Sequence, residues 1–327
     1  MNKIIKITKK FYTDSRYFSF ELATLHLKET MSRYTPYKMK EKAWLRKDQL
    51  ILDYLDAKYS NVNFTTVTPK KNKSDNIWVF WYQGEQAMPE IVKETFTSVK
   101  NNANGHKVIL ITKDNLETYL KIPNIIKERV SEGKITITEY SDIIRFWLLF
   151  DYGGLWIDAT VLVTRLIPER IFELPVFTIR NDLDKNSPLY YISVAHLRWT
   201  TYVFGGKAGN PLFSFIRDVL IDYNSKEPAL IDYLLLDYVI EYACRRSPKI
   251  RNVMNGIPES NVYKEDLINR LNATFPDENT ISLLKSDTFF FKLSYKIKYS
   301  QKSNRESNYK LLLDHSFFQK YNIGGQS

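Results

Sequence analysis

The chain contains a single cysteine, Cys244, among its 327 residues. One cysteine cannot form a disulfide within the chain, and it cannot build the cysteine-based zinc sites that stabilise many small domains. The chain also lacks any run close to the ~20 apolar residues that a helix needs to cross a bilayer. Its most apolar helical candidate, residues 229–243, is interrupted by Asp232, Asp237 and Glu241. A disulfide-rich scaffold and a membrane-spanning protein are therefore disfavoured.

The first residues, Met1–Lys6, lack an apolar stretch long enough for a secretory signal. Together with the single cysteine, this predicts a cytoplasmic location. A length of 327 residues allows one large domain or two smaller ones, and a hydrophobic fraction of 44% with 26% charged residues is typical of a soluble globular protein.

Acidic residues are in the minority, so the formal net charge is +10 and the pI about 9.3. A basic balance of this kind suits nucleic acid, an anionic membrane surface or an acidic small ligand. The basic residues form separate clusters, and no zinc-finger or homeodomain pattern accompanies them, so we expect no nucleic-acid partner. Peripheral contact with the inner face of the plasma membrane is the expectation that the family resemblance described below implies, and a merely solvated basic surface is the alternative. The clusters are Lys9–Lys10, Lys38–Lys47, Lys70–Lys73, Arg245–Arg246 and Lys292–Lys302.

Hydrophobic periodicity divides the chain into three segments. Residues 1–74 are predicted to be a helical N-terminal extension that ends in a polar linker at 68–74, and residues 301–327 a basic C-terminal tail. Between them, residues 75–300 alternate strand and helix patterns, which favours an α/β domain with a largely parallel sheet. The predicted strands are 77–81, 107–112, 135–138, 155–157, 176–179 and 201–204, and the predicted helices include 213–223 and 229–244, with a glycine-rich loop at 205–211.

The segment from Tyr140 to Thr160 places three charged residues among Ile, Phe, Leu and Trp. Ser141 is predicted to cap a helix that Gly153 terminates, and residues 155–157 to form a short buried strand. Asp142 and Arg145 would then share one helical face, and Asp158 would emerge at the end of the strand. Buried charges usually have a partner or a ligand, so the three could clamp a polar ligand. An ordinary ion pair between Asp142 and Arg145, with Asp158 as a turn residue, is the alternative.

The whole string SDIIRFWLLFDYGGLWIDAT resembles the core motif of glycosyltransferase family 32 and of the bacterial capsular polysaccharide synthesis proteins. Proteins of this kind are similar here to the glycosyltransferase domain of the large clostridial toxins. The resemblance covers roughly residues 75–300, with further matches at 77–84, 89–92, 105–108, 166–168 and the basic motif 292–296. It implies a GT-A type, Rossmann-like nucleotide-sugar-binding fold.

The resemblance also implies roles for individual residues. Asp142 and Arg145 would contact the donor sugar or ribose, and Trp156 would line the pocket. Asp158 corresponds to the first aspartate of the D-x-D motif, which holds Mn²⁺ or Mg²⁺ against a diphosphate. The third position of that motif is Thr160 here, a weaker ligand, so the metal site is an open expectation.

Other donor-binding groups are expected at the ends of the predicted sheet. Trp81, Tyr82 and Gln83 lie at the end of the first predicted strand of the domain, where an aromatic ring can stack on a base and an amide can read its edge. They could equally be ordinary core aromatics. Lys292 and Lys296 could supply positive charge to the diphosphate, or simply belong to a solvated basic segment.

The function implied is a retaining glycosyltransferase that moves a hexose from a UDP-sugar to a glycan acceptor, which is expected to be lipid-linked, in capsular or surface polysaccharide synthesis. A toxin-like transferase acting on proteins and a noncatalytic basic binding protein with a decayed sugar site are the alternatives. A nucleophile could be Asp232, Asp237 or Glu241, which interrupt an apolar helix, although attack from the leaving-group face needs none.

Overall fold

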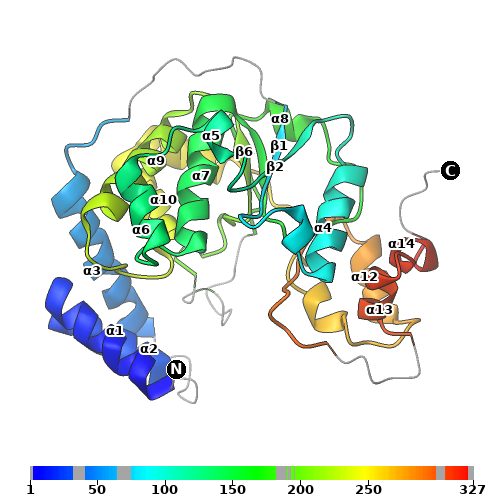
Figure 1. The fold of residues 1–327 in the computed structure, drawn as a ribbon, viewed down its shortest axis with the longest axis horizontal. Coiled ribbons are helices and arrows are strands. Elements are labelled where there is room, and N and C mark those ends of the chain that lie inside the picture. Colours follow the sequence, from blue (N-terminus) through cyan, green and yellow to red (C-terminus); the bar gives the residue numbers. More distant parts are fainter. Residues whose placement is uncertain are drawn as a thin grey trace.

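The computed structural model describes residues 3–31, 41–64, 75–181, 190, 193–194, 196–299 and 306–322. The predicted linker at 68–74 lies outside these residues. Figure 1 shows a central sheet with helices on both sides of it, the N-terminal helices at one end of the molecule and the C-terminal helices at the other.

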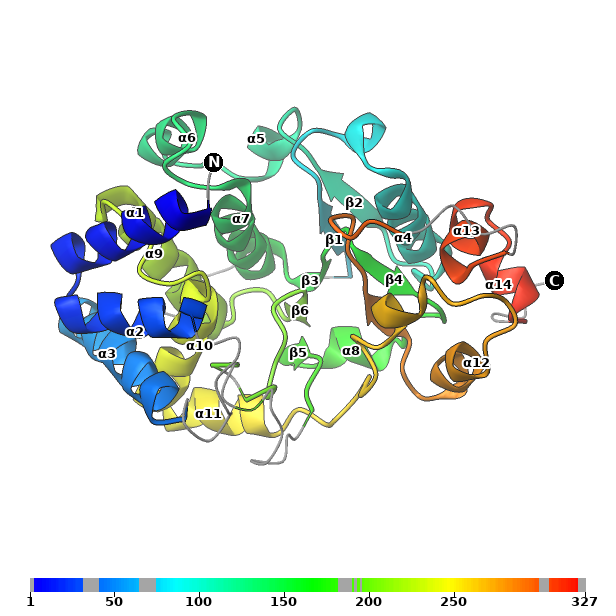
Figure 2. The ribbon, with the colours of Figure 1, turned by 90° about the horizontal axis from the view of Figure 1, so that it is seen from below.

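The N-terminal extension is helical, as the leucine spacing predicts. It comprises α1 (Lys3–Tyr17), α2 (Phe20–Met31) and α3 (Glu41–Tyr59). Figure 2 shows α1, α2 and α3 together at one end of the molecule, on the side where α9 (Pro211–Lys226) and α10 (Leu235–Arg246) lie. Leu52 and Leu55 of α3 are buried in the same core as Tyr238 and Val239 of α10, so the extension is packed onto the domain.

The central sheet has five strands in the order β2-β1-β3-β6-β5. The strands β2, β1 and β3 are parallel, whereas β6 is antiparallel to both of its neighbours. The predicted α/β class, with a largely parallel sheet and a helical N-terminal extension, is confirmed. The strands are β1 (Ile77–Phe80), β2 (Val108–Ile111), β3 (Gly154–Ile157), β5 (Val176–Thr178) and β6 (Val203–Gly206).

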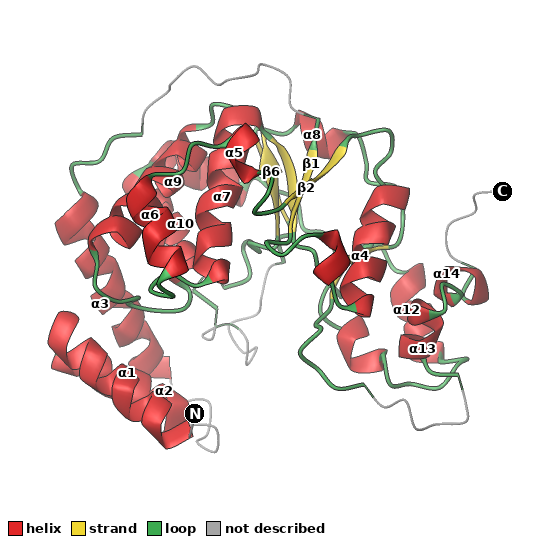
Figure 3. Cartoon of the chain, viewed as in Figure 1, coloured by secondary structure: helices red, strands yellow, loops and turns green. Residues whose placement is uncertain are grey.

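The alternation of side chains along β1 divides the core into two layers. Trp78 and Phe80 belong to the layer with α7 (Ile137–Tyr152), α9 and α10, while Ile77 and Val79 belong to the layer with α4 (Glu90–Asn101). All four residues are buried, as expected for a parallel strand covered on both faces. Figure 3 shows the strands between these two groups of helices.

Shorter elements complete the domain. On the chain between β1 and α7 lie η3 (Glu85–Ala87), α5 (Leu116–Tyr119) and α6 (Asn124–Ser131); farther on lie α8 (Arg170–Glu173), α11 (Pro248–Asn255), η4 (Leu267–Arg270) and α12 (Glu278–Lys285). Among the residues with a described position, no helix is both long and apolar enough to cross a membrane.

A second, two-stranded sheet was not predicted. β4 (Val161–Val163) pairs antiparallel with β7 (Phe290–Lys292), and Val161 lies opposite Lys292. Three-residue strands leave almost no periodic signal, and the pairing joins segments more than a hundred residues apart. This small sheet carries Lys292 to the end of β3.

The strand predicted at 135–138 is wrong, and so is the cap at Ser141. Thr136 is the N-cap of α7: its Oγ1 accepts a hydrogen bond from the Glu139 amide at 3.2 Å, and Glu139 Oε2 accepts one from the Thr136 amide at 2.9 Å. This capping box stabilises the helix start and outweighs the β-branched residues there. Ser141 lies inside the helix and donates to the Thr138 carbonyl.

The glycine-rich loop predicted at 205–211 is only partly a loop, because Gly205 and Gly206 belong to β6. A Cβ atom at Gly205 would lie 2.6 Å from the Gly154 carbonyl oxygen of β3, so the close approach of the two strands requires glycine there. Asn210 caps α9 through its side chain.

The described part of the predicted C-terminal tail is folded. It forms α13 (Asn308–Leu313) and α14 (Phe317–Lys320), and Leu311, Leu312 and Phe317 are buried in the layer that contains α4. The division of the chain at residue 300 remains a prediction.

Candidate functional site

The ends of β1 and β3 lie side by side, because the two strands are parallel and Trp78 pairs with Trp156. Trp81 follows the last residue of β1, and Asp158 follows the last residue of β3. Carboxyl ends of parallel strands are where open α/β sheets bind ligands. The sequence-predicted residues Trp81 and Asp158 therefore meet at the expected edge.

Asp158 is surrounded by three donors. Lys292 Nζ lies 2.7 Å from its Oδ2, while Trp156 Nε1 donates to Oδ1 at 2.8 Å and Arg145 Nη2 at 3.2 Å. The Asp158 side chain is 27% exposed. Residues from α7, β3 and β7 are thus joined at one carboxylate that solvent can still reach.

Arg145 is the buried centre of the site, with its side chain only 4% exposed. Its guanidinium lies 5.0 Å from the Trp156 ring centroid, and its Nη1 is 3.3 Å from Asp142 Oδ1. Trp156 is 1% exposed, so it supports Arg145 and Asp158 from within the core. Within the described chain, Arg145 Nε and Nη1 make no hydrogen bond. Buried donors without a partner are uncommon in native proteins and are available to a ligand.

The pKa values of the two carboxylates beside Arg145 are shifted in opposite directions. Burial raises the pKa of Asp142 to about 7, although the Arg145 charge opposes the rise; the charges of Asp158 and Asp237 add to it. Burial also acts to raise the pKa of Asp158, but the charges of Lys292 and Arg145 outweigh it and hold the value below the ordinary one. Asp158 is therefore ionised at neutral pH, while Asp142 exchanges its proton there.

A third carboxylate, Asp237 of α10, lies near enough to the same arginine to be influenced by its charge. Burial raises its pKa to about 6, against the lowering effects of its hydrogen bond from Trp199 Nε1, at 3.0 Å, and of the Arg145 charge. Trp199 was not singled out in the sequence; its only sign is a tryptophan just before a predicted strand.

The other two nucleophile candidates are occupied elsewhere. Asp232 accepts hydrogen bonds from His26 Nε2 at 3.0 Å and Lys47 Nζ at 3.2 Å, which ties it to the N-terminal helices. Glu241 forms ion pairs with Arg198 and Arg245. Of these three acids, the structure brings only Asp237 to the arginine.

The basic motif at residues 292–296, which begins at the last residue of β7, lies at the same edge of the sheet. Tyr295 packs edge-to-face against Trp81, with ring centroids 5.5 Å apart, and Lys292 Nζ lies 4.9 Å from the Tyr202 ring centroid. Lys296 is exposed beside Tyr295. Tyr202 is a further residue that no sequence pattern identified.

The aromatic residues after β1 differ in exposure and contacts. Trp81 Nε1 is buried and has no hydrogen-bond partner in the described chain, so it too can donate to a ligand. Tyr82 packs edge-to-face on Tyr140 at 6.3 Å, and Gln83 is exposed.

The protein groups around Asp158 do not form a set of ligands that could hold a divalent metal without further ligands. Both oxygens of Asp158 already accept from N–H donors, two of which are cationic. Across the described residues, no three His, Cys, Asp or Glu side chains are grouped as metal ligands. Thr160 offers a hydroxyl at most, whereas Mg²⁺ prefers carboxylate, phosphate and water oxygens.

Comparison with known proteins places the chain in a family. Residues 31–312 match the family model described as "Capsular polysaccharide synthesis protein". A curated relative, O-glycosyltransferase PaGT of Phomopsis amygdali, is 24% identical over 121 residues, which cover 32% of this chain and 30% of that protein's length. The solved structure of PaToxG Glycosyltransferase is similar at a TM-score of 0.36 and 12% identity, over 68% of this chain and 89% of that chain. The family model covers most of the sequence, and the chain belongs to the capsular polysaccharide synthesis protein family.

Proposed function

We propose that this protein is a retaining glycosyltransferase that moves a hexose from a UDP-sugar to a glycan acceptor during capsular or surface polysaccharide synthesis. The observation that carries the proposal is the convergence of Asp142, Arg145, Asp158 and Lys292 at the ends of β1 and β3. Family membership and the name of the curated relative support a sugar-transferring activity.

The donor sugar would be held by Arg145. Its Nε and Nη1, which make no hydrogen bond in the described chain although Nη1 is ion-paired with Asp142, can donate to sugar hydroxyls. The carboxylates of Asp142 and Asp237 can accept hydrogen bonds from sugar hydroxyls. Because Arg145 is buried and packed on Trp156, these donors keep a fixed direction. Fixed hydrogen-bonding groups orient a substrate without reorganisation during the reaction.

The leaving diphosphate would receive positive charge from Lys292. The ammonium group of Lys292 forms an ion pair with Asp158, and this contact holds it at the edge of the sheet. A diphosphate there would share that ammonium group, and the charge that develops on the departing UDP would be stabilised. Trp81 and Tyr82 would pack on the base, and Gln83 and Lys296, both exposed, would contact the outer part of the donor.

For the transfer step we favour attack from the face that the leaving group vacates. The acceptor hydroxyl loses its proton to an oxygen of the departing phosphate, and the new glycosidic bond keeps the configuration of the donor. No carboxylate nucleophile is needed. Asp237, which lies near enough to Arg145 to be influenced by its charge, would then orient the acceptor hydroxyl or the sugar.

A divalent ion remains part of the proposal only through Asp158. Asp158 and Thr160 are the residues that would hold the predicted Mn²⁺ or Mg²⁺, which would supply positive charge to the diphosphate; Lys292 supplies such a charge beside Asp158 already. Titration of UDP in MnCl₂ and in EDTA tests this point, because equal affinity in both would assign the diphosphate to the cationic side chains.

The lipid-linked character of the acceptor is supported by the exposed face of α1. Ile5, Lys9, Tyr12 and Arg16 are all exposed on this helix and follow one another at helical spacing. Such a mixture of apolar and basic side chains suits the surface of an anionic membrane. Sedimentation with phosphatidylglycerol vesicles should carry the protein down, whereas the double variant Ile5→Glu, Tyr12→Glu should stay in solution; equal sedimentation would contradict the contact.

The proposed activity is tested by incubating the protein with a panel of nucleotide sugars and measuring the nucleotide released. We expect release from a UDP-hexose above all others. Release from none of them, with or without added glycan acceptors, would contradict the proposal.

A further inference from the structure

A cavity of about 530 Å³ lies at the far end of the β4–β7 sheet from Asp158. The sheet explains the separation: Val161 and Lys292 form its end near Asp158, and Val163 and Phe290 its other end. Arg165 lines the cavity and follows β4 by two residues. A volume of this size is within the roughly 300–1,000 Å³ of pockets that hold small organic ligands.

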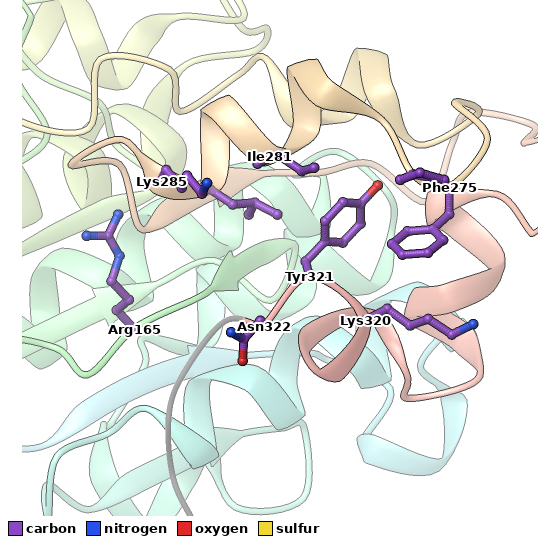
Figure 4. Close-up of a pocket in the computed structure, with 9 residues that line it drawn as sticks. Arg165, Phe275, Ile281, Lys285, Lys320, Tyr321 and Asn322 are labelled. Atoms are coloured by element: carbon purple, nitrogen blue, oxygen red, sulfur yellow. The ribbon is translucent and has the colours of Figure 1, made fainter.

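The polar part of the cavity wall is cationic. It includes Arg165, Lys285 of α12 and Lys320 of α14, and none of the described residues that line it is Asp or Glu. Figure 4 shows Arg165 and Lys285 close together at one end and Lys320 toward the other, with the Tyr321 ring between them. Lys320 is partly neutralised by Glu306 at 2.7 Å. Lys285 is exposed and makes no ion pair within the described chain.

Arg165 adds a donor that none of the described protein groups uses. Its Nη2 donates to the carbonyl oxygens of Ser286 and Thr288, which fixes the guanidinium. Its Nε is buried and has no hydrogen-bond partner in the part of the chain that is described. The end of the cavity with Arg165 and Lys285 therefore offers two positive charges and a spare N–H group, which suits a phosphate.

The remaining wall is apolar. Ile281 and Leu284 of α12 line it, together with the rings of Phe275 and Tyr321, which meet edge-to-face at 5.1 Å. The Tyr321 hydroxyl is hydrogen-bonded to Asn308 Oδ1 at 2.5 Å and leaves the ring face to the cavity. A sugar chain would bring many hydroxyl groups to this wall, and each hydroxyl buried without a partner is unfavourable. A hydrocarbon group carries no hydroxyl that needs a partner, and its burial against this apolar wall is favourable.

We propose that this cavity binds an amphiphilic organic phosphate, with a short hydrocarbon chain against α12 and Tyr321 and one or two phosphates between Arg165 and Lys285. This binding does not depend on the proposed glycosyltransferase function. The further step, that the ligand is the anchor of a lipid-linked acceptor, rests on that function.

The test is calorimetric titration of the full chain with farnesyl diphosphate below its aggregation concentration. Farnesyl diphosphate should bind saturably, and both farnesol and inorganic pyrophosphate should bind at least about tenfold more weakly, because each lacks half of the recognised groups. Equal affinity for pyrophosphate would overturn the proposal, since it would reveal a plain phosphate site, and so would no binding of farnesyl diphosphate.

Two charge reversals make the matched comparison. Lys285→Glu should weaken farnesyl diphosphate binding about tenfold or more. Lys249→Glu changes the net charge equally but lies on α11, away from the cavity, and should leave the affinity unchanged. Equal weakening in both variants would mean non-specific attraction to a basic protein and would overturn the proposal.

Measuring nucleotide release in the same variants separates this site from the sugar site. Lys285→Glu should release UDP from the donor at the unaltered rate, because Lys285 lies at the other end of the β4–β7 sheet. A parallel loss of UDP release and of farnesyl diphosphate binding would mean that the two sites are one, which would overturn the assignment of a separate cavity. Loss of UDP release in Asp158→Asn, with farnesyl diphosphate binding intact, is the result expected if both proposals hold.

Discussion

Lys292 Nζ lies 2.7 Å from Asp158 Oδ2, although 134 residues separate the two along the chain. The contact exists because β7 pairs with β4, which begins three residues after Asp158. A cation from the end of the domain thus completes a site that is otherwise built from α7, β1 and β3.

Replacement of Lys292 by methionine should lower the rate of sugar transfer about a hundredfold, because the developing charge on the leaving diphosphate loses its cation. The pKa of Asp158 should rise, since Lys292 is the largest of the influences that lower it. Steady-state rates of UDP release check the first effect. Lys298→Met, an exposed lysine of the same segment, is the control and should keep full activity; an equal loss in both variants would remove Lys292 from the site.

Asp142 should make the stability of the protein depend on pH. Its folded pKa of about 7 lies above the ordinary value of 3.8, so the folded state binds a proton more tightly than the unfolded state between these values. Stability from this group is complete below about pH 4 and falls as the pH rises through 7. The maximum loss is about 4 kcal/mol, from roughly three pKa units at 1.36 kcal/mol each.

Chemical denaturation of Asp142→Asn at pH 5 and pH 8 measures this effect. The variant cannot ionise, so its stability relative to the natural protein should be higher at pH 8 than at pH 5. Asp237, whose pKa is also raised, contributes in the same direction and remains in both proteins. A relative stability that does not change with pH would show that Asp142 is ionised throughout this range.

Trp199→Phe tests the role of Asp237, which the sequence could not distinguish from Asp232 and Glu241. The change removes the indole N–H that donates to Asp237 Oδ1 and keeps most of the buried ring. Because that hydrogen bond lowers the pKa of Asp237, its loss should raise the pKa above about 6. If Asp237 acts as a carboxylate, the acidic limb of the pH–rate profile should move to higher pH, by about one unit. An unmoved limb with a reduced maximum would indicate a purely structural tryptophan.

Thr136→Ala should destabilise the protein by about 1 kcal/mol, because it removes the side-chain oxygen that caps α7. Ser141→Ala removes a hydroxyl of the same helix that caps nothing and should change the free energy of unfolding by less than about 0.5 kcal/mol. Urea denaturation of both variants makes the comparison, and the reverse order would show that the helix begins at Ser141.

The differences between sequence and structure have local physical causes. The bounds of β3 were predictable, because a glycine stop at Gly153 and the charged residue Asp158 flank an apolar run. The start of α7 was not, because Ile135 and Ile137 favour a strand until the reciprocal bonds of Thr136 and Glu139 are known. Likewise, Asp232 and Asp237 look alike in the sequence, yet one pairs with the N-terminal helices and the other with Trp199.

The central claim is that the charged residues around Asp158 bind and activate a nucleotide sugar. The most direct measurement is the rate of UDP release from the preferred donor by the natural protein and by Asp158→Asn, with circular dichroism to show that both are folded. The account predicts a loss of at least about a hundredfold at unchanged fold, because Asp158 holds Lys292 and Arg145 in place through its charge. A folded Asp158→Asn protein with full activity would contradict it.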